Sequence, residues 1–133
     1  MPIGQPSGKG GPMPARPPFL IIRRVAAAAA LCVAVAIGYL SLVPVGEVPA
    51  PQISDKIRHL AAYAGLAAPL TLALHPRRWL VAALVAAIYG VCLEFGQAYG
   101  GAGREGSALD ALANLAGALL GAAMIRFSAG VRG

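Results

Sequence analysis

The chain has 133 residues, of which 58% are hydrophobic and only 12% are charged, and its formal net charge is +6. A soluble globular domain is normally about 45–50% apolar and about 25% charged, so this composition excludes an ordinary cytosolic domain as well as a disordered chain. Two cysteines are too few for a disulfide-rich secreted module. The length predicts one domain, and the composition predicts that its solvent is lipid.

The positive charge does not indicate a nucleic-acid partner. A nucleic-acid-binding domain gathers its Lys and Arg residues on one face of a soluble fold. Here they form short clusters between apolar runs, which is the pattern that flanks membrane spans. We therefore expect membrane lipids, and no nucleic acid, as partners.

The N-terminal segment and the first apolar run differ sharply in composition. Residues 1–20 are rich in glycine and proline and are predicted to form a disordered cytoplasmic tail. Residues 25–45 contain no charge over 21 positions, enough to cross a hydrocarbon core of about 30 Å at about 1.5 Å per residue. A first transmembrane helix is predicted at about 24–45.

Three further apolar runs follow, and each is too short to cross the membrane by itself. Each has only 15 residues without a charge, or about 22 Å of helix. Their polar flanks must therefore be helical too, which predicts helices at about 55–74, 79–98 and 108–127. Apolar residues surround these helices on every side, whereas a soluble bundle would need polar faces. The predicted fold is all-α, with a four-helix transmembrane domain over 21–128 and a short tail at 129–133.

The distribution of cations predicts the orientation of this polytopic protein. Eight of the eleven Lys and Arg residues lie in the N-terminal tail, in the loop around Arg77 and at the C-terminus. Cytoplasmic segments carry such an excess, so both termini are expected in the cytoplasm. The chain is then a multi-pass protein of the inner (cytoplasmic) membrane, and all five acidic residues lie toward the outer side.

Polar residues follow a helical spacing at the outer ends of three predicted helices. The second helix carries a stripe at i, i+4 and i+8, the third a pair at i, i+3, and the fourth a pair at i, i+4. Ionisable residues at membrane depth are costly unless they are paired or face a wet interior. Antiparallel helices bring these three ends to one membrane face. The predicted binding cluster comprises Asp55, Lys56, His59, Tyr63, Glu94, Gln97, Arg104, Asp110 and Asn114.

Several of these residues also have a simpler interpretation. Asp55, preceded by Ser54, is well placed to cap the second helix. His59 fits an interfacial histidine, and Arg104 fits a solvated loop cation. Gln97 is expected to hydrogen-bond to Glu94. The sequence leaves open, for each of these residues, a structural role or membership of the binding cluster.

The same residues resemble the motif set of the VanZ-like family, which consists of small bacterial integral membrane proteins named for a teicoplanin-resistance protein. The matching motifs are Asp55-Lys56-x-x-His59 with Tyr63, Glu94-x-x-Gln97, Arg104, and Asp110-x-x-x-Asn114-x-x-Gly117. The resemblance extends over residues 25–127. Extra glycines distinguish the loop before Asp110 from the family pattern. The resemblance implies a role in the bacterial cell envelope, with a contribution to glycopeptide tolerance.

Three functions remain open, beside the alternative of a purely structural subunit. The first is a protein that binds a lipid-linked cell-wall precursor or a glycopeptide-like headgroup in an outer-face polar pocket. The second is a membrane-embedded enzyme that acts on a lipid headgroup through a metal ion or through acid–base chemistry. The third is a small proton-coupled exporter. No serine or cysteine has an evident base and no established metal-ligand motif is present, so no catalytic residue, metal or cofactor is assigned and an enzyme is the less favoured reading.

Small residues on the last predicted helix indicate close helix packing. Ala113, Gly117 and Gly121 form a stripe of the small-xxx-small type. Such a stripe serves equally within one bundle or between two copies, so a homodimer through small-residue helix faces is one expected arrangement.

Overall fold

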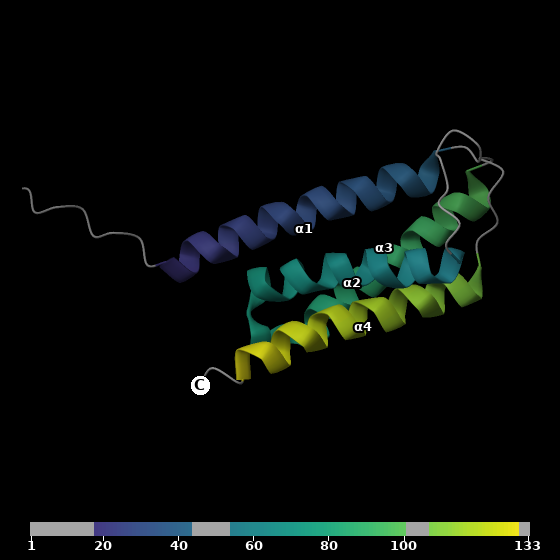
Figure 1. Cartoon of the computed structure of the whole chain (residues 1–133). Coiled ribbons are helices and arrows are strands. Elements are labelled where there is room, and N and C mark those ends of the chain that lie inside the picture. The colour runs from purple at the N-terminus through teal and green to yellow at the C-terminus, as the bar shows by residue number, and fades with distance from the viewer. Residues whose placement is uncertain (1–17, 44–53, 101–106, 131–133) are drawn as a thin grey trace, which may run out of the picture.

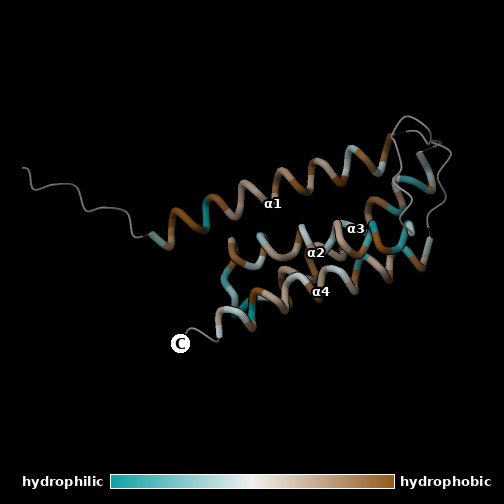
Figure 2. The backbone as a smooth tube through the Cα atoms, in the orientation of Figure 1, coloured by the Kyte–Doolittle hydropathy of each residue, from teal (hydrophilic) through white to brown (hydrophobic). Residues whose placement is uncertain are grey.

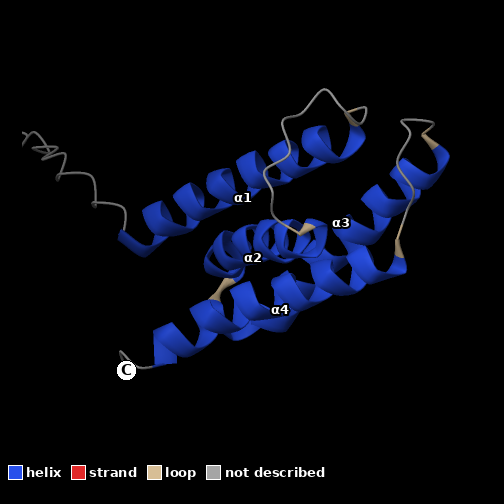
Figure 3. Cartoon of the chain, turned by 45° about the vertical axis from the view of Figure 1, so that its right-hand side comes forward, coloured by secondary structure: helices blue, strands red, loops and turns tan. Residues whose placement is uncertain are grey.

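A computed structural model describes residues 18–43, 54–100 and 107–130 of the chain. They form helix α1 (Pro18–Leu42), helix α2 (Asp55–Leu74), a short 3-10 helix η1 (Pro76–Arg78), helix α3 (Trp79–Tyr99) and helix α4 (Ala108–Gly130) (Figures 1 and 3). No strand occurs within these ranges. Four helical segments are long and apolar enough to cross a membrane, which confirms the predicted all-α architecture of four candidate spans.

The observed helix ends lie close to the predicted ones. The bounds of α2 were predicted correctly, and α3 ends one residue later than expected. Helix α1 begins at Pro18 rather than at residue 24. Proline is tolerated there because backbone N–H groups in the first turn make no hydrogen bond within the helix, so the absence of an N–H costs nothing. It ends at Leu42 rather than at residue 45, and the following Pro44 disfavours a helical conformation for the residue before it. Residues 18–20 and 129–130, predicted as parts of the two tails, are therefore helical. The remaining residues of both tails lie outside the described ranges.

Alternating helix directions bring the ends of distant segments together. The start of α1 and the end of α4 lie at one end of the bundle, and the starts of α2 and α4 lie at the other (Figure 1). Arg23 near the start of α1 donates from Nε to the carbonyl oxygen of Ala73 at 2.8 Å. That carbonyl belongs to the last turn of α2, whose terminal oxygens have no partner within the helix. Arg23, predicted only as a membrane-flanking charge, is thus also a cap of α2.

The tightest helix contact in the bundle joins α2 and α4 through two glycines. A Cβ atom placed on Gly117 would lie 2.1 Å from the carbonyl oxygen of Leu60, and one on Gly121 would lie 2.2 Å from that of Ala64. The two backbones are therefore in direct contact, as small residues allow in membrane proteins. This face of α4 is already covered by α2 of the same chain, so a homodimer would have to use another face.

Apolar side chains cover the outside of the bundle, and small ones fill its interior. Large exposed residues include Leu31, Leu84 and Met124, and brown, hydrophobic stretches run along all four helices in Figure 2. The buried core is dominated by alanines such as Ala67, Ala86 and Ala118. An apolar outer surface around a core of small residues is typical of helices that pack against one another in a membrane.

Helix α1 lies along the group formed by α2, α3 and α4 (Figure 1). The Tyr89 hydroxyl of α3 donates to the carbonyl oxygen of Ala34 at 2.6 Å. Near the C-terminal ends of the same two helices, Gln97 Nε2 donates to the carbonyl oxygen of Ser41 at 2.8 Å. In lipid, such interhelical hydrogen bonds contribute about 1 kcal/mol each, so they add to apolar packing in holding α1 in place.

Candidate functional site

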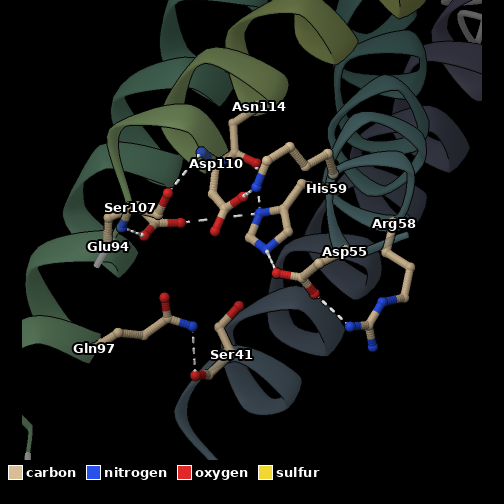
Figure 4. Close-up of polar contacts among 10 residues, drawn as sticks. Ser41, Asp55, Arg58, His59, Glu94, Gln97, Ser107, Asp110 and Asn114 are labelled. Carbon is tan, nitrogen blue, oxygen red and sulfur yellow. Dashed lines mark hydrogen bonds and ion pairs between the residues drawn. The ribbon is translucent and has the colours of Figure 1, made fainter. Parts of the chain in front are cut away.

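Six charged or polar residues gather where the start of α2, the end of α3 and the start of α4 meet (Figure 4). We call this group the polar cluster; it consists of Asp55, Lys56, His59, Glu94, Asp110 and Asn114. Its buried members are Glu94, Asp110 and Asn114, which are 9%, 8% and 1% exposed. The predicted convergence of three helix ends is therefore present in the structure.

Asp110 is held from two sides. Lys56 Nζ of α2 lies 3.0 Å from its Oδ1 atom and forms an ion pair between the two helices. Asp110 also stands in the first turn of α4, where unpaired backbone N–H groups favour a negative charge. A carboxylate at this position is accordingly stabilised although it is buried.

His59 lies at the centre of the cluster. Its Nδ1 atom is 2.9 Å from Oδ1 of Asn114 and 3.9 Å from Oε1 of Glu94. Its Nε2 atom lies 3.7 Å from Oδ2 of Asp55, which is longer than a hydrogen bond. With the Asn114 amide oriented so that Oδ1 faces His59, a neutral imidazole makes this hydrogen bond by carrying its proton on Nδ1.

Glu94 connects α3 to Ser107, the residue that precedes α4. Its Oε2 atom accepts a hydrogen bond of 3.0 Å from the backbone N–H of Ser107, and its Oε1 atom faces His59. Since the first N–H groups of a helix have no internal partner, this carboxylate satisfies one donor at the entrance to α4. Glu94 therefore has both a structural contact and a face turned to the cluster.

The charges of the cluster nearly balance. Two permanent cations accompany its three carboxylates. Lys56 pairs with Asp110, and the guanidinium of Arg58 pairs with Asp55. Binding of one proton or one further positive group near His59 would balance the remaining charge. Cations at both edges allow three acids to lie close together.

The other predicted site residues lie elsewhere. Tyr63 is 2% exposed and is buried beneath the cluster, where its ring and the Asn114 amide both lie against Gly90. Gln97 donates to the carbonyl oxygen of Ser41 of α1, so its expected role as the hydrogen-bonding partner of Glu94 was wrong. The two methylene groups of glutamine let its amide reach the neighbouring helix instead. Arg104 lies outside the described residues.

The simpler interpretation of Asp55 as a cap has little support. Ser54 is the N-cap residue of α2 and makes no side-chain capping hydrogen bond. Asp55 is the first helical residue, and its carboxylate contacts Arg58 and faces His59. Its position in the first turn still favours the helix electrostatically, so Asp55 serves both the helix and the cluster.

An apolar groove between α3 and α4 leads to the polar cluster. It has a volume of about 230 Å³. Its lining residues are Val91, Glu94, Phe95, Ala98, Ser107, Ala108 and Ala111. Glu94 belongs to both the groove and the cluster, so the groove joins the outer, apolar surface of the bundle to the buried charges.

Arg58 was expected, with Lys56 and Arg104, to hold anionic groups of a ligand; its ion pair with Asp55 and the groove were not predicted. The spacing of Asp55 and Arg58 at i, i+3 is a signal for an ion pair on one helix. The groove has no such signal, because it depends on how far α3 and α4 diverge.

The chain was also compared with known proteins. No family model, curated protein or solved structure matches the chain.

Proposed function

We propose that this chain is a VanZ-like protein of the bacterial cytoplasmic membrane that binds the headgroup of a membrane amphiphile in its polar cluster. The amphiphile is a lipid-linked cell-wall precursor or a lipid-like glycopeptide, and its binding contributes to glycopeptide tolerance. Both termini are cytoplasmic in this proposal, and the cluster opens at the outer face of the membrane.

The observation that carries the proposal is the position of Glu94. Glu94 faces His59 of the polar cluster through its Oε1 atom and is also one of the residues that line the apolar groove. A lipid-like ligand needs both surfaces side by side, since its headgroup requires charged partners and its chain requires an apolar channel. Entry between α3 and α4 would let such a ligand reach the cluster from within the bilayer.

The composition of the cluster suits a headgroup with both hydroxyl or amino groups and anionic groups. Glu94 accepts hydrogen bonds from the former. Lys56 and Arg58, which are half-exposed at the edge of the cluster, attract the latter. Sugar–phosphate headgroups combine these two kinds of group.

The ligand test uses native mass spectrometry of the full chain in detergent, incubated with an isoprenoid-pyrophosphate-linked precursor or with phosphatidylglycerol. Glu94→Gln should weaken precursor retention about tenfold, because a hydrogen bond to a charged group contributes about 1.5–3 kcal/mol. Ala98→Phe should do the same by filling the groove. Its control, Ala116→Phe, places the same ring at an exposed position of α4 that does not line the groove. Equal retention by all four proteins would refute the proposal.

The proposed orientation predicts accessibility from outside the cell. With Cys32 and Cys92 replaced by alanine, Gly101→Cys should react with a membrane-impermeant thiol reagent in intact cells, because it follows α3 at the proposed outer end. Arg77→Cys, between α2 and α3, should react only after the cells are opened. The reverse pattern would place the cluster at the cytoplasmic face and exclude an outer-leaflet ligand.

A further inference from the structure

Three potential metal ligands from two helices lie close together in the polar cluster. One ligand atom each from Asp55, His59 and Asp110 lies within 4.8 Å of the other two. Zn²⁺ binds such atoms at about 2.0–2.2 Å in a tetrahedral arrangement, so atoms that share one ion lie about 3.3–3.6 Å apart. Asp55 is half-exposed in the first turn of α2 and pairs with Arg58 of the same helix, so its carboxylate would make the remaining inward movement together with this exposed partner.

The protonation of His59 suits a metal ligand. With its proton on Nδ1, directed at Asn114, the lone pair of Nε2 faces Oδ2 of Asp55 across 3.7 Å. Two electron-pair donors that face each other repel unless a proton or a metal ion lies between them. Metal-binding histidines almost always donate their second N–H to an oxygen in this way, which fixes the ring.

Asn114 supplies a second, independent observation. This side chain is 1% exposed and directs its oxygen into the cluster, yet its Nδ2 atom has no hydrogen-bond partner. Leaving a buried donor unpaired is unfavourable, so keeping Asn114 at this position has a cost that its hydrogen bond to His59 must offset. Holding the His59 ring in one orientation for a bound ion explains why the amide is kept there.

We propose that Asp55, His59 and Asp110 bind one divalent transition-metal ion, of the type of Zn²⁺ or Mn²⁺, with Asn114 as the positioning residue for His59. An imidazole nitrogen with carboxylate oxygens favours these ions over Ca²⁺ and Mg²⁺, which prefer oxygen ligands alone. Arg58 and Lys56 contact one carboxylate of the site each, on Oδ1 of Asp55 and Oδ1 of Asp110. The second oxygen of each carboxylate remains for the ion. This inference goes beyond headgroup binding and does not depend on it.

A substitution of Lys56 should increase the affinity for Zn²⁺. Lys56 Nζ lies on Asp110, so its positive charge opposes a cation at the same carboxylate. Lys56→Gln should therefore tighten Zn²⁺ binding by about threefold or more, even with screening at a half-exposed site. A loss of folding cannot produce such a gain.

The test is a calorimetric titration of the full-length, chelator-treated protein in detergent with Zn²⁺ alone, without lipid. Wild type should bind one ion per chain, and Ca²⁺ at the same concentration should not compete. His59→Gln and Asp110→Asn should abolish binding. Asn114→Ala should weaken it about 10–100-fold, as loss of a group that orients a ligand does. The control is His75→Gln, which removes the second histidine of the chain, at the opposite end of α2.

The outcomes separate this site from the proposed function. Absence of Zn²⁺ binding by wild type, or binding that His75→Gln removes and His59→Gln does not, would overturn the metal site. Circular dichroism of each variant identifies those that fail to fold, and in that case the Lys56→Gln gain and the wild-type stoichiometry decide. Lipid retention measured with chelator present tests headgroup binding separately, so either proposal is able to fail alone.

Discussion

Gly117→Ala and Gly121→Ala are each expected to destabilise the protein strongly, and together to prevent assembly of the bundle. The added Cβ atoms would lie 2.1 and 2.2 Å from backbone oxygens of α2. A backbone oxygen within a helix moves only with the helix, so α2 and α4 would have to separate. Overpacking of this kind costs about 1–3 kcal/mol per site, and here both sites act on the same interface.

Separation of α2 and α4 would also disrupt the candidate site. His59 stands on α2 and Asn114 on α4, and their 2.9 Å hydrogen bond spans the interface that the glycines make possible. We therefore expect both variants to lose ligand binding along with stability. The measurement is the temperature at which half of the monodisperse protein is lost in detergent, followed by size-exclusion chromatography.

Gly65→Ala is the matched control for the glycine variants. A Cβ atom at Gly65, in the middle of α2, would meet nothing within 4 Å. Alanine is the better helix former by about 1 kcal/mol, so this variant should be as stable as wild type or more so. If Gly117→Ala behaved like Gly65→Ala, the close approach of α2 and α4 would be wrong.

Neutralising the buried acids is expected to separate function from folding. Asp110→Asn removes the ion pair with Lys56, but the half-exposed lysine is then hydrated, so the loss of stability should be about 1 kcal/mol or less. Glu94→Gln keeps an oxygen that accepts the Ser107 N–H. Ligand retention, in contrast, should weaken about tenfold in both, because each substitution removes a charged partner of the headgroup.

The coupling of the cluster is measured by a double-mutant cycle between His59→Gln and Asp110→Asn. If both residues contact the same ligand, the effects of the two substitutions on the free energy of ligand binding should be non-additive by about 0.5–3 kcal/mol. If both single variants unfolded the protein, the cluster would be a structural ion-pair core. If both were silent and additive, the residues would be solvated helix ends and no site would exist.

The sequence by itself determined the four spans and the end of the bundle at which the polar residues meet. Hydrophobic length and the charges that bound it place helix ends closely, as the bounds of α2 show. The i, i+4 spacing of Asp55 and His59 places them on one helix face. These properties are local, because they depend only on helix geometry and on the cost of polar groups in lipid.

Only the tertiary structure decided which partner each side chain takes. Lys56 contacts Asp110 rather than a residue of its own helix, Gln97 turns to Ser41 of α1, and Arg23 caps α2. Helical periodicity states which face a residue occupies but not which helix lies opposite or at what distance. That distance is set by the two glycines of α4, and it brings His59 to within a hydrogen bond of Asn114. The site therefore depends on a backbone contact that no spacing of polar residues records.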